Sequence, residues 1–293
     1  MLYIRGHKII KGYIGNTPVS HVGFGKSGLI KIKSENGGSD YPNNLIAKYT
    51  TNASGVLPTF NNGYQYTVNE TESNGIYTVE LFSDTDFTSC SFNGKTQLLT
   101  VDYLKVTDKV TSIYGMFYNC TKLTQLDVSN WDTSNVTVMN HVFNNCSKLI
   151  RLDVSNFNTS KVINMYSMFN SCKLLTQLDV SNFDTTNVTN MSYMFAYCSQ
   201  LIQLDVSNFN TSKITNMSSF IASASVLQNF ISCAIPVSFG ASGTALTHDS
   251  LMSIINNLAT VTTTQTLTLG STNLAKLSSE EKAIATNKGW TLA

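Results

Sequence analysis

The sequence predicts an α/β solenoid that follows a small all-β domain. One phrase occurs four times at intervals of 26 residues, starting at Leu126, Leu152, Leu178 and Leu204. The same period runs without a gap from about residue 115 to residue 221. A unit this short cannot bury its own apolar face, whereas stacked copies can. The repeat therefore predicts a column of coils around one shared core.

Each repeat combines three local patterns. Leu152 and Val154 are two residues apart, which is the period of a strand with both side chains on one side. Val162, Met165 and Phe169 follow at a spacing near three, which fits a short helix or 3₁₀ turn. The segment between these two patterns is rich in Ser, Asn, Asp and Thr, the residues of turns. We expect a strand, a corner and a helical turn in every coil.

The fixed positions carry a family resemblance. Cys, Leu, Leu and Val at the spacing C-x2-L-x2-L-x-V precede V-x2-M-x2-[MV]-F, so that eight positions recur in register. This pattern resembles the BspA-type leucine-rich repeat, in the version found in many bacterial and phage surface proteins. The resemblance covers about residues 98–230. It implies a right-handed solenoid with a parallel sheet on one face. It also implies a role in adhesion or recognition, not the catalysis of one reaction.

The chain divides into two parts on this interpretation. Residues 1–75 form the β-rich N-terminal domain, in which residues 66–79 read as a hairpin. A recurrence of Tyr-x-Gly near the start resembles short β modules at the N-termini of some phage tail-associated proteins. Residues 76–293 form the solenoid, with the regular repeats at 115–221 and an α/β cap at 245–293. Within the cap we expect a helix begun by Thr247 or Asp249, a strand at 264–270, a helix ending at Gly289 and a last strand.

Composition excludes several partners. Charged residues make up only 13% of the 293 residues and the net charge is +1, without a basic cluster, so nucleic acid is not expected as a partner. No apolar run reaches the ~18 residues that a membrane span needs. The first residues lack the apolar core of a secretory signal. We expect no cofactor and no metal site, since no cysteine lies near a histidine at ligand spacing.

Four aspartates recur at one place in the repeat, namely Asp127, Asp153, Asp179 and Asp205. Stacked strands lie about 4.8 Å apart, where unit charges repel by roughly 1 kcal/mol in water and roughly 3 kcal/mol at an effective dielectric of 20. One interpretation is a cation- or ligand-binding row, in which the flanking polar residues could hydrogen-bond a sugar: Gln125, Arg151, Gln177 and Gln203. The other is that each carboxylate accepts hydrogen bonds from neighbouring Ser, Thr and Asn groups and fixes the turn. We favour the second.

Two further ladders are assigned to the core. The cysteines Cys120, Cys146, Cys172 and Cys198 would be close enough for disulfides, yet they stand among apolar positions and are interpreted as buried thiols. The aromatic ladder of Trp131, Phe157, Phe183 and Phe209 could stack on carbohydrate, but a fixed repeat position indicates packing between coils.

The positions that differ between copies are the more informative ones about binding. Tyr166 and Tyr193 occupy such positions, and with Tyr114, Tyr118 and Tyr197 they predict a tyrosine-rich patch beside the expected helical turns. Tyrosine supplies a large amphipathic contact area at low entropic cost, so the patch is either a recognition surface or a partly buried edge. No catalytic set emerges: the four histidines are scattered, and "GFGKSG" lacks the first glycine of a phosphate-binding loop.

These observations predict a non-enzymatic structural and recognition protein of a phage particle, a tail or head fibre component. The N-terminal domain would attach to other virion proteins, the solenoid would bind a glycan or protein of the host surface, and the chain would form a homo-oligomer. It would be located in the virion after assembly in the host cytoplasm. The alternative is a bacterial cell-surface or secreted adhesin, and an enzyme such as a glycan hydrolase comes third.

Overall fold

The structure is a computed structural model that describes residues 2–4, 7–9, 21–24, 30–33 and 45–293. Two antiparallel pairs lie in the first part: β1 (Leu2–Ile4) with β2 (His7–Ile9), and β3 (His21–Phe24) with β4 (Ile30–Lys33). β4 follows "GFGKSG", where a phosphate-binding loop would open a helix. Residues 25–28 of this segment lie outside the described residues.

A five-stranded sheet joins the first half of the chain to the repeats. Its order is β11 (Gln125–Leu126), β10 (Leu98–Leu104), β5 (Leu45–Thr51), β8 (Ile76–Phe82) and β7 (Thr67–Ser73). The strands β6 (Thr59–Phe60) and β9 (Cys90–Ser91) form a separate antiparallel pair. β7 and β8 form the hairpin expected at 66–79. The boundary expected after residue 75 falls in the turn of this hairpin and does not separate two sheets.

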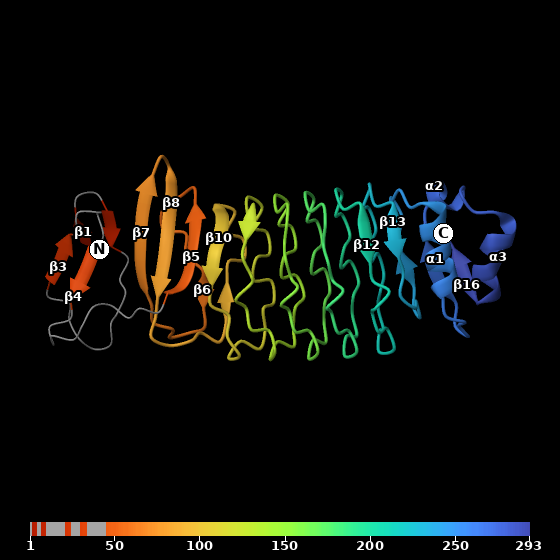
Figure 1. Cartoon of the computed structure of the whole chain (residues 1–293), viewed down its shortest axis with the longest axis horizontal. Coiled ribbons are helices and arrows are strands. Elements are labelled where there is room, and N and C mark those ends of the chain that lie inside the picture. The colour runs from red at the N-terminus through yellow and green to blue at the C-terminus, as the bar shows by residue number, and fades with distance from the viewer. Residues whose placement is uncertain (1, 5–6, 10–20, 25–29, 34–44) are drawn as a thin grey trace.

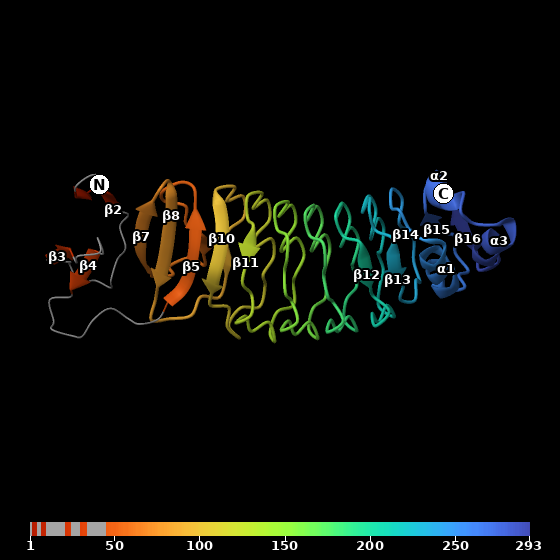
Figure 2. The ribbon, with the colours of Figure 1, turned by 45° about the horizontal axis from the view of Figure 1, so that its top comes forward.

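β10 is the strand at which the antiparallel sheet becomes a column of coils. It pairs antiparallel with β5 on one side and parallel with β11 on the other. From β10 onward the coils lie side by side along the long axis of the molecule, and the cap follows them (Figures 1 and 2). One parallel ladder of backbone bridges crosses the column through Ser112, Val138, Asn164, Asn190 and Asn216. Residues one repeat apart are thus direct neighbours.

The segment expected to be a helical turn is a run of tight turns, so that expectation was wrong. In the second coil the N–H groups of Met139, His141, Phe143 and Asn145 donate to carbonyls of the next coil, those of Asn164, Tyr166, Met168 and Asn170. In a helix these N–H groups would donate to carbonyls of the same helix. The turns instead place a residue with positive φ at every fourth position, and alternate N–H groups therefore point along the column. Among the residues with positive φ are His141, Asn145, Ser167, Ser171, Tyr193 and Tyr197.

The Leu-x-Val segments form strands only near the two ends of the column. There β11 pairs with β10, and β12 (Gln203–Asp205) pairs with β13 (Asn229–Ile231). In the two middle repeats the segments at 149–154 and 175–180 are extended without strand pairing, and Thr176 N lies 3.5 Å from Ile150 O. The expected sheet across all repeats is therefore interrupted. Burial still alternates as predicted, since Leu152 and Val154 are buried while Arg151 and Asp153 are exposed.

Side-chain hydrogen bonds from exposed Asn residues and buried Thr residues replace the missing backbone pairs on this side. Asn182 Nδ2 donates to the carbonyls of Val154 and Phe157, both at 3.0 Å. Thr159 Oγ1 donates to Asp184 O at 2.9 Å, and its side chain is 1% exposed. Equivalent bonds recur in the neighbouring coils, from Asn130, Asn156, Asn208, Thr133, Thr185 and Thr211. The Asn and Thr of each repeat are thus internal ties between coils as well as turn formers.

The interior of the column consists of ladders of identical side chains. Phe143, Phe169 and Phe195 stack with ring centroids 5.6 Å apart at each step. Each ladder thiol donates to a phenylalanine carbonyl of the preceding coils, as Cys172 Sγ does to Phe143 O at 3.2 Å. The prediction of buried thiols is confirmed for the four ladder cysteines, Cys90 and Cys233 are buried as well, and burial raises the pKa of Cys198 to about 12. Trp131, Phe157, Phe183 and Phe209 are also buried, which assigns that ladder to the core.

The cap follows the predicted order of elements. Its helices are α1 (His248–Asn257), α2 (Ser271–Leu274) and α3 (Ser279–Asn287), and its strands β14 (Phe239–Gly240), β15 (Gln265–Thr268) and β16 (Trp290–Leu292) form a parallel sheet. Thr247 caps α1, Ser278 and Glu281 form a capping box on α3, and Gly289 follows α3 with φ +90°. The helix α2 was not predicted, because its four residues carry no side-chain cap, and neither was the two-residue strand β14.

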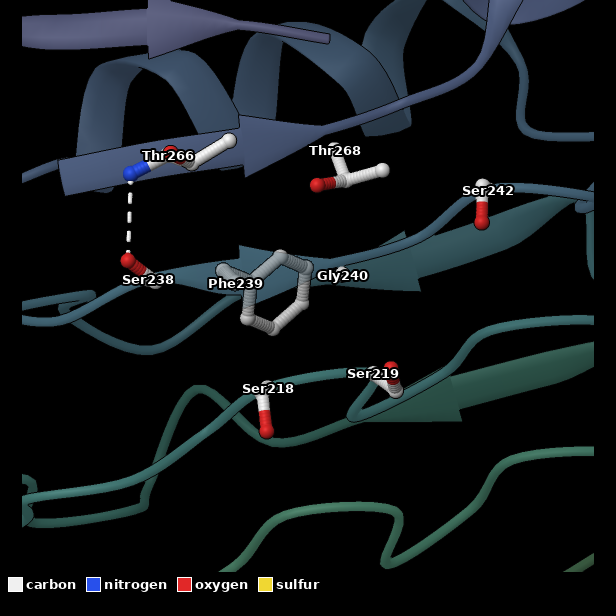
Figure 3. Close-up of a pocket in the computed structure, with 8 residues that line it drawn as sticks. All are labelled: Ser218, Ser219, Ser238, Phe239, Gly240, Ser242, Thr266 and Thr268. Atoms are coloured by element: carbon white, nitrogen blue, oxygen red, sulfur yellow. Dashed lines mark hydrogen bonds between the residues drawn. The ribbon is translucent and has the colours of Figure 1, made fainter.

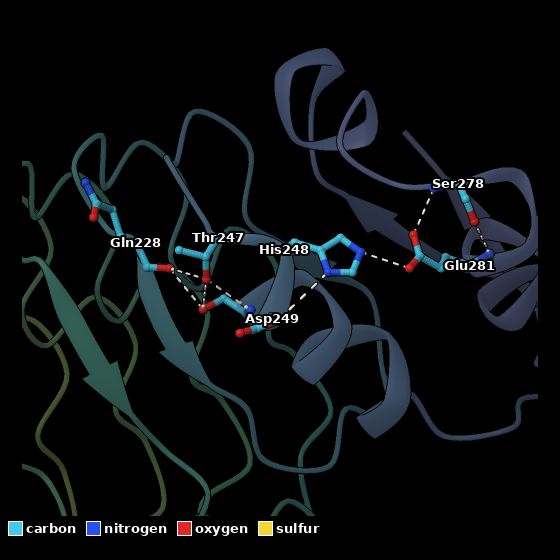
Figure 4. A network of polar contacts seen from close by, with 7 residues as sticks. Gln228, Thr247, His248, Asp249, Ser278 and Glu281 are labelled. Carbon is cyan, nitrogen blue, oxygen red and sulfur yellow. Dashed lines mark hydrogen bonds and ion pairs between the residues drawn. The ribbon is translucent and has the colours of Figure 1, made fainter.

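The cap also closes the column. Ser250 and Ser253 of α1 accept hydrogen bonds from the backbone N–H groups of Phe230 in β13 and of Ser232 just after it. Helix side chains thus occupy the place of a further strand, which protects the edge from pairing with another chain. His248 Nε2 lies 2.8 Å from Glu281 Oε1 and ties α1 to α3 (Figure 4). Among the described residues, no helix has both the length and the apolar character required to cross a bilayer.

The stacked phenylalanines predict a large stability effect. Phe169 is fully buried between Phe143 and Phe195. Phe169→Ala should lower the free energy of unfolding by about 3–5 kcal/mol, because it leaves a cavity in a ladder that cannot collapse without shifting whole coils. Gln177→Ala, at an exposed position of the next coil, is the control and should change it by less than about 0.5 kcal/mol. Denaturant unfolding followed by circular dichroism measures both, and equal effects would contradict the ladder as the core.

Candidate functional site

The four predicted aspartates form an exposed row on the Leu-x-Val side of the column. The first carboxylate oxygen of each accepts the backbone N–H of the serine two residues on, at 2.9 Å in every copy. Hydrogen bonds from the Ser155 hydroxyl and N–H lower the pKa of Asp153. The N–H and hydroxyl of Ser181 likewise lower the pKa of Asp179, although the charge of Asp153 opposes this. The row is therefore a set of turn-fixing carboxylates, the second of the two interpretations.

The polar residues that flank this row are placed in solvent. Gln125, Arg151, Gln177 and Gln203 are all exposed and alternate with the buried leucines. Within the described part of the chain, no three His, Cys, Asp or Glu side chains gather closely enough to hold a metal ion. The row thus offers a ligand separate polar groups on an open surface.

The predicted tyrosine patch lies along a different side of the column, and aromatic contacts join five of its six rings. We call it the tyrosine strip, and it consists of Tyr114, Tyr118, His141, Tyr166, Tyr193 and Tyr197. His141 is its centre, with ring centroids 5.9 Å from Tyr114, 5.6 Å from Tyr118 and 4.8 Å from Tyr166. Tyr166 in turn lies 6.1 Å from Tyr193. The structure therefore brings together Tyr166 and Tyr193, which the sequence singled out.

Backbone geometry makes two of these tyrosines unusual. Tyr193 and Tyr197 adopt φ of +58° and +59°, a region in which a bulky residue costs about 1–2 kcal/mol. Their N–H groups donate to Ser218 O and Ala222 O of the next coil, which offsets the cost. The other coils meet the same requirement with Ser, Asn or His, as at Ser167, Asn145 and His141. Smaller residues occupy the same place in other coils, so the backbone conformation alone does not require a ring at 193 or 197.

One end of the tyrosine strip forms a small depression. Asn93, Tyr114, Gly115, Tyr118 and His141 line it, around a volume of about 110 Å³. The Nδ1 atom of His141 lies 2.9 Å from Asn144 Nδ2. Burial lowers the pKa of His141 below its ordinary value, so the ring is neutral near pH 7. This end of the strip is aromatic and uncharged.

A second depression, lined by hydroxyl groups, lies where the same side of the column reaches the cap. Its volume is about 120 Å³, and its side-chain hydroxyls come from Ser218, Ser219, Ser238, Ser242, Thr266 and Thr268 (Figure 3). Gly240 forms part of it, and a Cβ there would lie 2.7 Å from Ser219 N and Cα. The glycine thus permits the close approach of two coils. Sequence reasoning missed this site, because no repeated motif marks the residues that line it.

The aspartate row predicts a difference between two substitutions. Asp153→Asn should leave stability nearly unchanged, because Asn158 and Asn164 accept the same type of N–H bond with an amide oxygen. Asp153→Ala removes the acceptor and should cost about 0.5 kcal/mol. Thermal unfolding at neutral pH compares the two. A stabilising effect of Ala, or a loss with Asn as large as that with Ala, would show that the charge and not the turn governs this position.

The tyrosine strip predicts a pH effect. The pKa of His141 is below 6.5 in the folded state, so the unfolded chain binds more protons as the pH falls through this range. The neutral ring stabilises the fold above the unfolded pKa, and this contribution is lost on acidification toward the folded pKa. Wild type should therefore lose more stability between about pH 7 and pH 5 than His141→Ser, which carries the residue found at Ser167 and Ser219. Calorimetry measures the difference, and an NMR pKa of 6.5 or above for His141 would contradict it.

The comparisons with known proteins concern the repeats. Residues 105–233 match the model of a family described as "Mycoplasma protein of unknown function, DUF285". Among solved structures, a leucine-rich repeat protein from Bacteroides ovatus is 14% identical, with a TM-score of 0.26. That match covers 70% of this chain and 58% of the other, so the chain spans little more than half the length of that protein. No curated protein matches. The repeats are thus similar to a bacterial family whose own function is unknown.

Proposed function

We propose that this chain is a non-enzymatic recognition protein whose repeats form a right-handed solenoid of the leucine-rich-repeat class, displayed on a phage particle. One observation carries the proposal: the apolar positions that the copies share are buried, whereas aromatic positions that vary between copies lie on one side of the column, where Tyr114 and Tyr193 are exposed and Tyr166 is half-buried. Aromatic surface that varies over a repeated apolar core supports binding by the varied side.

The chemistry of the described residues supports recognition in place of catalysis. Burial raises the pKa of the ladder thiols, so they are poor nucleophiles. The aspartates of the row all accept the same type of hydrogen bond, whereas a glycan hydrolase needs one carboxyl that stays protonated beside one that is ionised. His248 is held by Glu281 on the surface of the cap, where its neighbours tie helices together.

Two observations support the phage particle as the carrier. The six cysteines are unpaired, although neighbouring thiols repeat along the column, which fits assembly in a reducing cytoplasm. The N-terminal sequence resembles modules of phage tail-associated proteins, and an attachment role for it leaves the repeats free to face the host. A homo-oligomer, as is common for fibres, would then multiply the binding strips.

A bacterial surface adhesin is the second candidate. The match of residues 105–233 to a family described from Mycoplasma favours it. Both candidates share the recognition function of the repeats and differ in what carries the chain.

Binding to cells tests the recognition function. Purified protein should bind cells of the host bacterium and compete with phage adsorption, and a variant lacking residues 152–177 should bind less. This deletion removes one whole repeat, including Tyr166, and joins Arg151 to Leu178 in register, so the column is shortened without a break. Deleting residues 147–172 removes the same length in register, and it should behave alike. Circular dichroism confirms folding, and wild type that binds no cells would overturn the proposal.

Mass spectrometry of purified particles and of bacterial surface fractions separates the two carriers. Presence in particles at a fixed ratio to a tail or capsid protein is expected. Recovery from bacterial surface fractions only would replace the phage assignment by the adhesin.

A further inference from the structure

The side of the column that carries the tyrosine strip has no charged residue along its entire length. The segments of this side contain no Asp, Glu, Lys or Arg. These segments are residues 112–119, 138–145, 164–171, 190–197, 216–223, 238–243 and 265–270. Backbone bridges join them in order, from Ser112 to Asn216, from Met217 to Phe239, and from β14 to β15. They therefore form one continuous surface, which we call the neutral face. Charged side chains lie on other sides of the column, as in the aspartate row and at Lys161 and Lys213.

The neutral face changes character from one end to the other. Its first coils expose the rings of the tyrosine strip, and its last coils expose the hydroxyls of the second depression. Exposed aliphatic side chains such as Ile150, Ile202 and Ile231 lie instead on the side of the aspartate row. The neutral face thus offers aromatic surface and neutral hydrogen-bonding groups, without charge.

We propose that the neutral face binds an uncharged, extended glycan along the axis of the column. This inference rests on the proposed recognition function and names the ligand class. A pyranose ring has C–H faces that pack on aromatic rings and a rim of hydroxyls that exchange hydrogen bonds with Tyr, Ser, Thr and Asn. An uncharged face provides no ion pair for an acidic polysaccharide or a nucleic acid, which basic residues recognise.

The dimensions of the face favour a polymer over a single sugar. Neighbouring coils are about 4.8 Å apart, so the face from the first segment to the last spans roughly 30 Å. One residue of an extended glycan advances by a length similar to one coil, so that ligand and protein repeats stay in step. Each added residue meets a further coil, and affinity therefore rises with chain length until the face is filled.

A protein ligand fits the face less well. Tyrosine-rich surfaces do bind proteins, but such interfaces are also enriched in Arg and Met at their centres. All methionines of these segments are fully buried, and arginine is absent from the segments. A protein ligand is therefore an outcome that the experiment must distinguish.

The chain supplies its own matched substitutions. Ser192 and Ser218 stand at the place of Tyr166, and Ser167 and Ser219 stand at the place of Tyr193. Tyr166→Ser and Tyr193→Ser thus install residues that other coils already accommodate, with the positive φ at 193 shared by Ser167 and Ser219. The control is Gln177→Ser, an exposed change on the side of the aspartate row.

Immobilised neutral polysaccharides, a glucan, a mannan and a galactan, are the probes, with polygalacturonate as the anionic comparison. We expect binding to at least one neutral polymer that is insensitive to salt and strengthens with oligosaccharide length. Each tyrosine substitution should weaken it about tenfold, as expected for the loss of one aromatic contact, and Gln177→Ser should not. Salt-sensitive binding to polygalacturonate alone, or equal binding by the tyrosine variants, would overturn the proposal.

Treated host cells separate failure of the glycan from failure of recognition. Periodate, which cleaves sugar diols, should abolish binding of the purified protein, and protease treatment should leave it intact. Binding that survives periodate and is lost after protease would show a protein ligand, so that the glycan is wrong while recognition stands. Absence of binding to untreated cells would overturn the recognition function itself.

Discussion

The hydrogen bonds between main-chain groups one coil apart are the interaction on which this structure depends. A tight turn normally uses its N–H groups locally, and a column needs some of them to point along its axis. The residues with positive φ, one at every fourth position of the turn segment, solve this conflict, because they turn alternate N–H groups toward the next coil. The buried Phe, Cys and Met ladders can then repeat at the same spacing, since each coil is held in register by its neighbour. On the other side of the column, where strand pairing is interrupted, Asn182 and Thr159 show how side chains perform the same task.

Much of this fold could be predicted from the sequence, because the period and the apolar positions record burial directly. Leu152, Val154 and Phe169 are buried as expected, and the caps at Thr247 and Ser278 are local signals that the structure confirms. The turn segment could not be predicted in the same way. Its apolar spacing near three fits a helix and a run of turns equally well, and the positive φ values are held by contacts with other coils. The internal ties from Asn and Thr were read as turn formers for the same reason, since their partners are a full repeat away.

The candidate site likewise has one part that the sequence predicted and one part that it did not. Tyr166 and Tyr193 drew attention because they vary between otherwise identical copies, and the structure joins them through one row of aromatic contacts. The hydroxyl-lined depression carried no such signal. It combines residues of the last repeat with Ser238 and Thr266 of the cap, and only the close approach at Gly240 brings them together. Sites that depend on the meeting of a regular and an irregular part of a chain leave no period in the sequence.

The mode of coil pairing explains why the exposed surface is free to change. The bonds that hold the turn segments together come from the backbone, so a side chain at a position such as 193 contributes little to register. It must only tolerate a positive φ, and Ser, Asn, His and Tyr all do so in this chain. The fixed positions and the varied positions are therefore separated by a physical criterion, namely whether the side chain or only the main chain joins the coils. In this chain the positions 193 and 197 therefore hold bulky rings, although the turn itself requires only a residue that tolerates a positive φ.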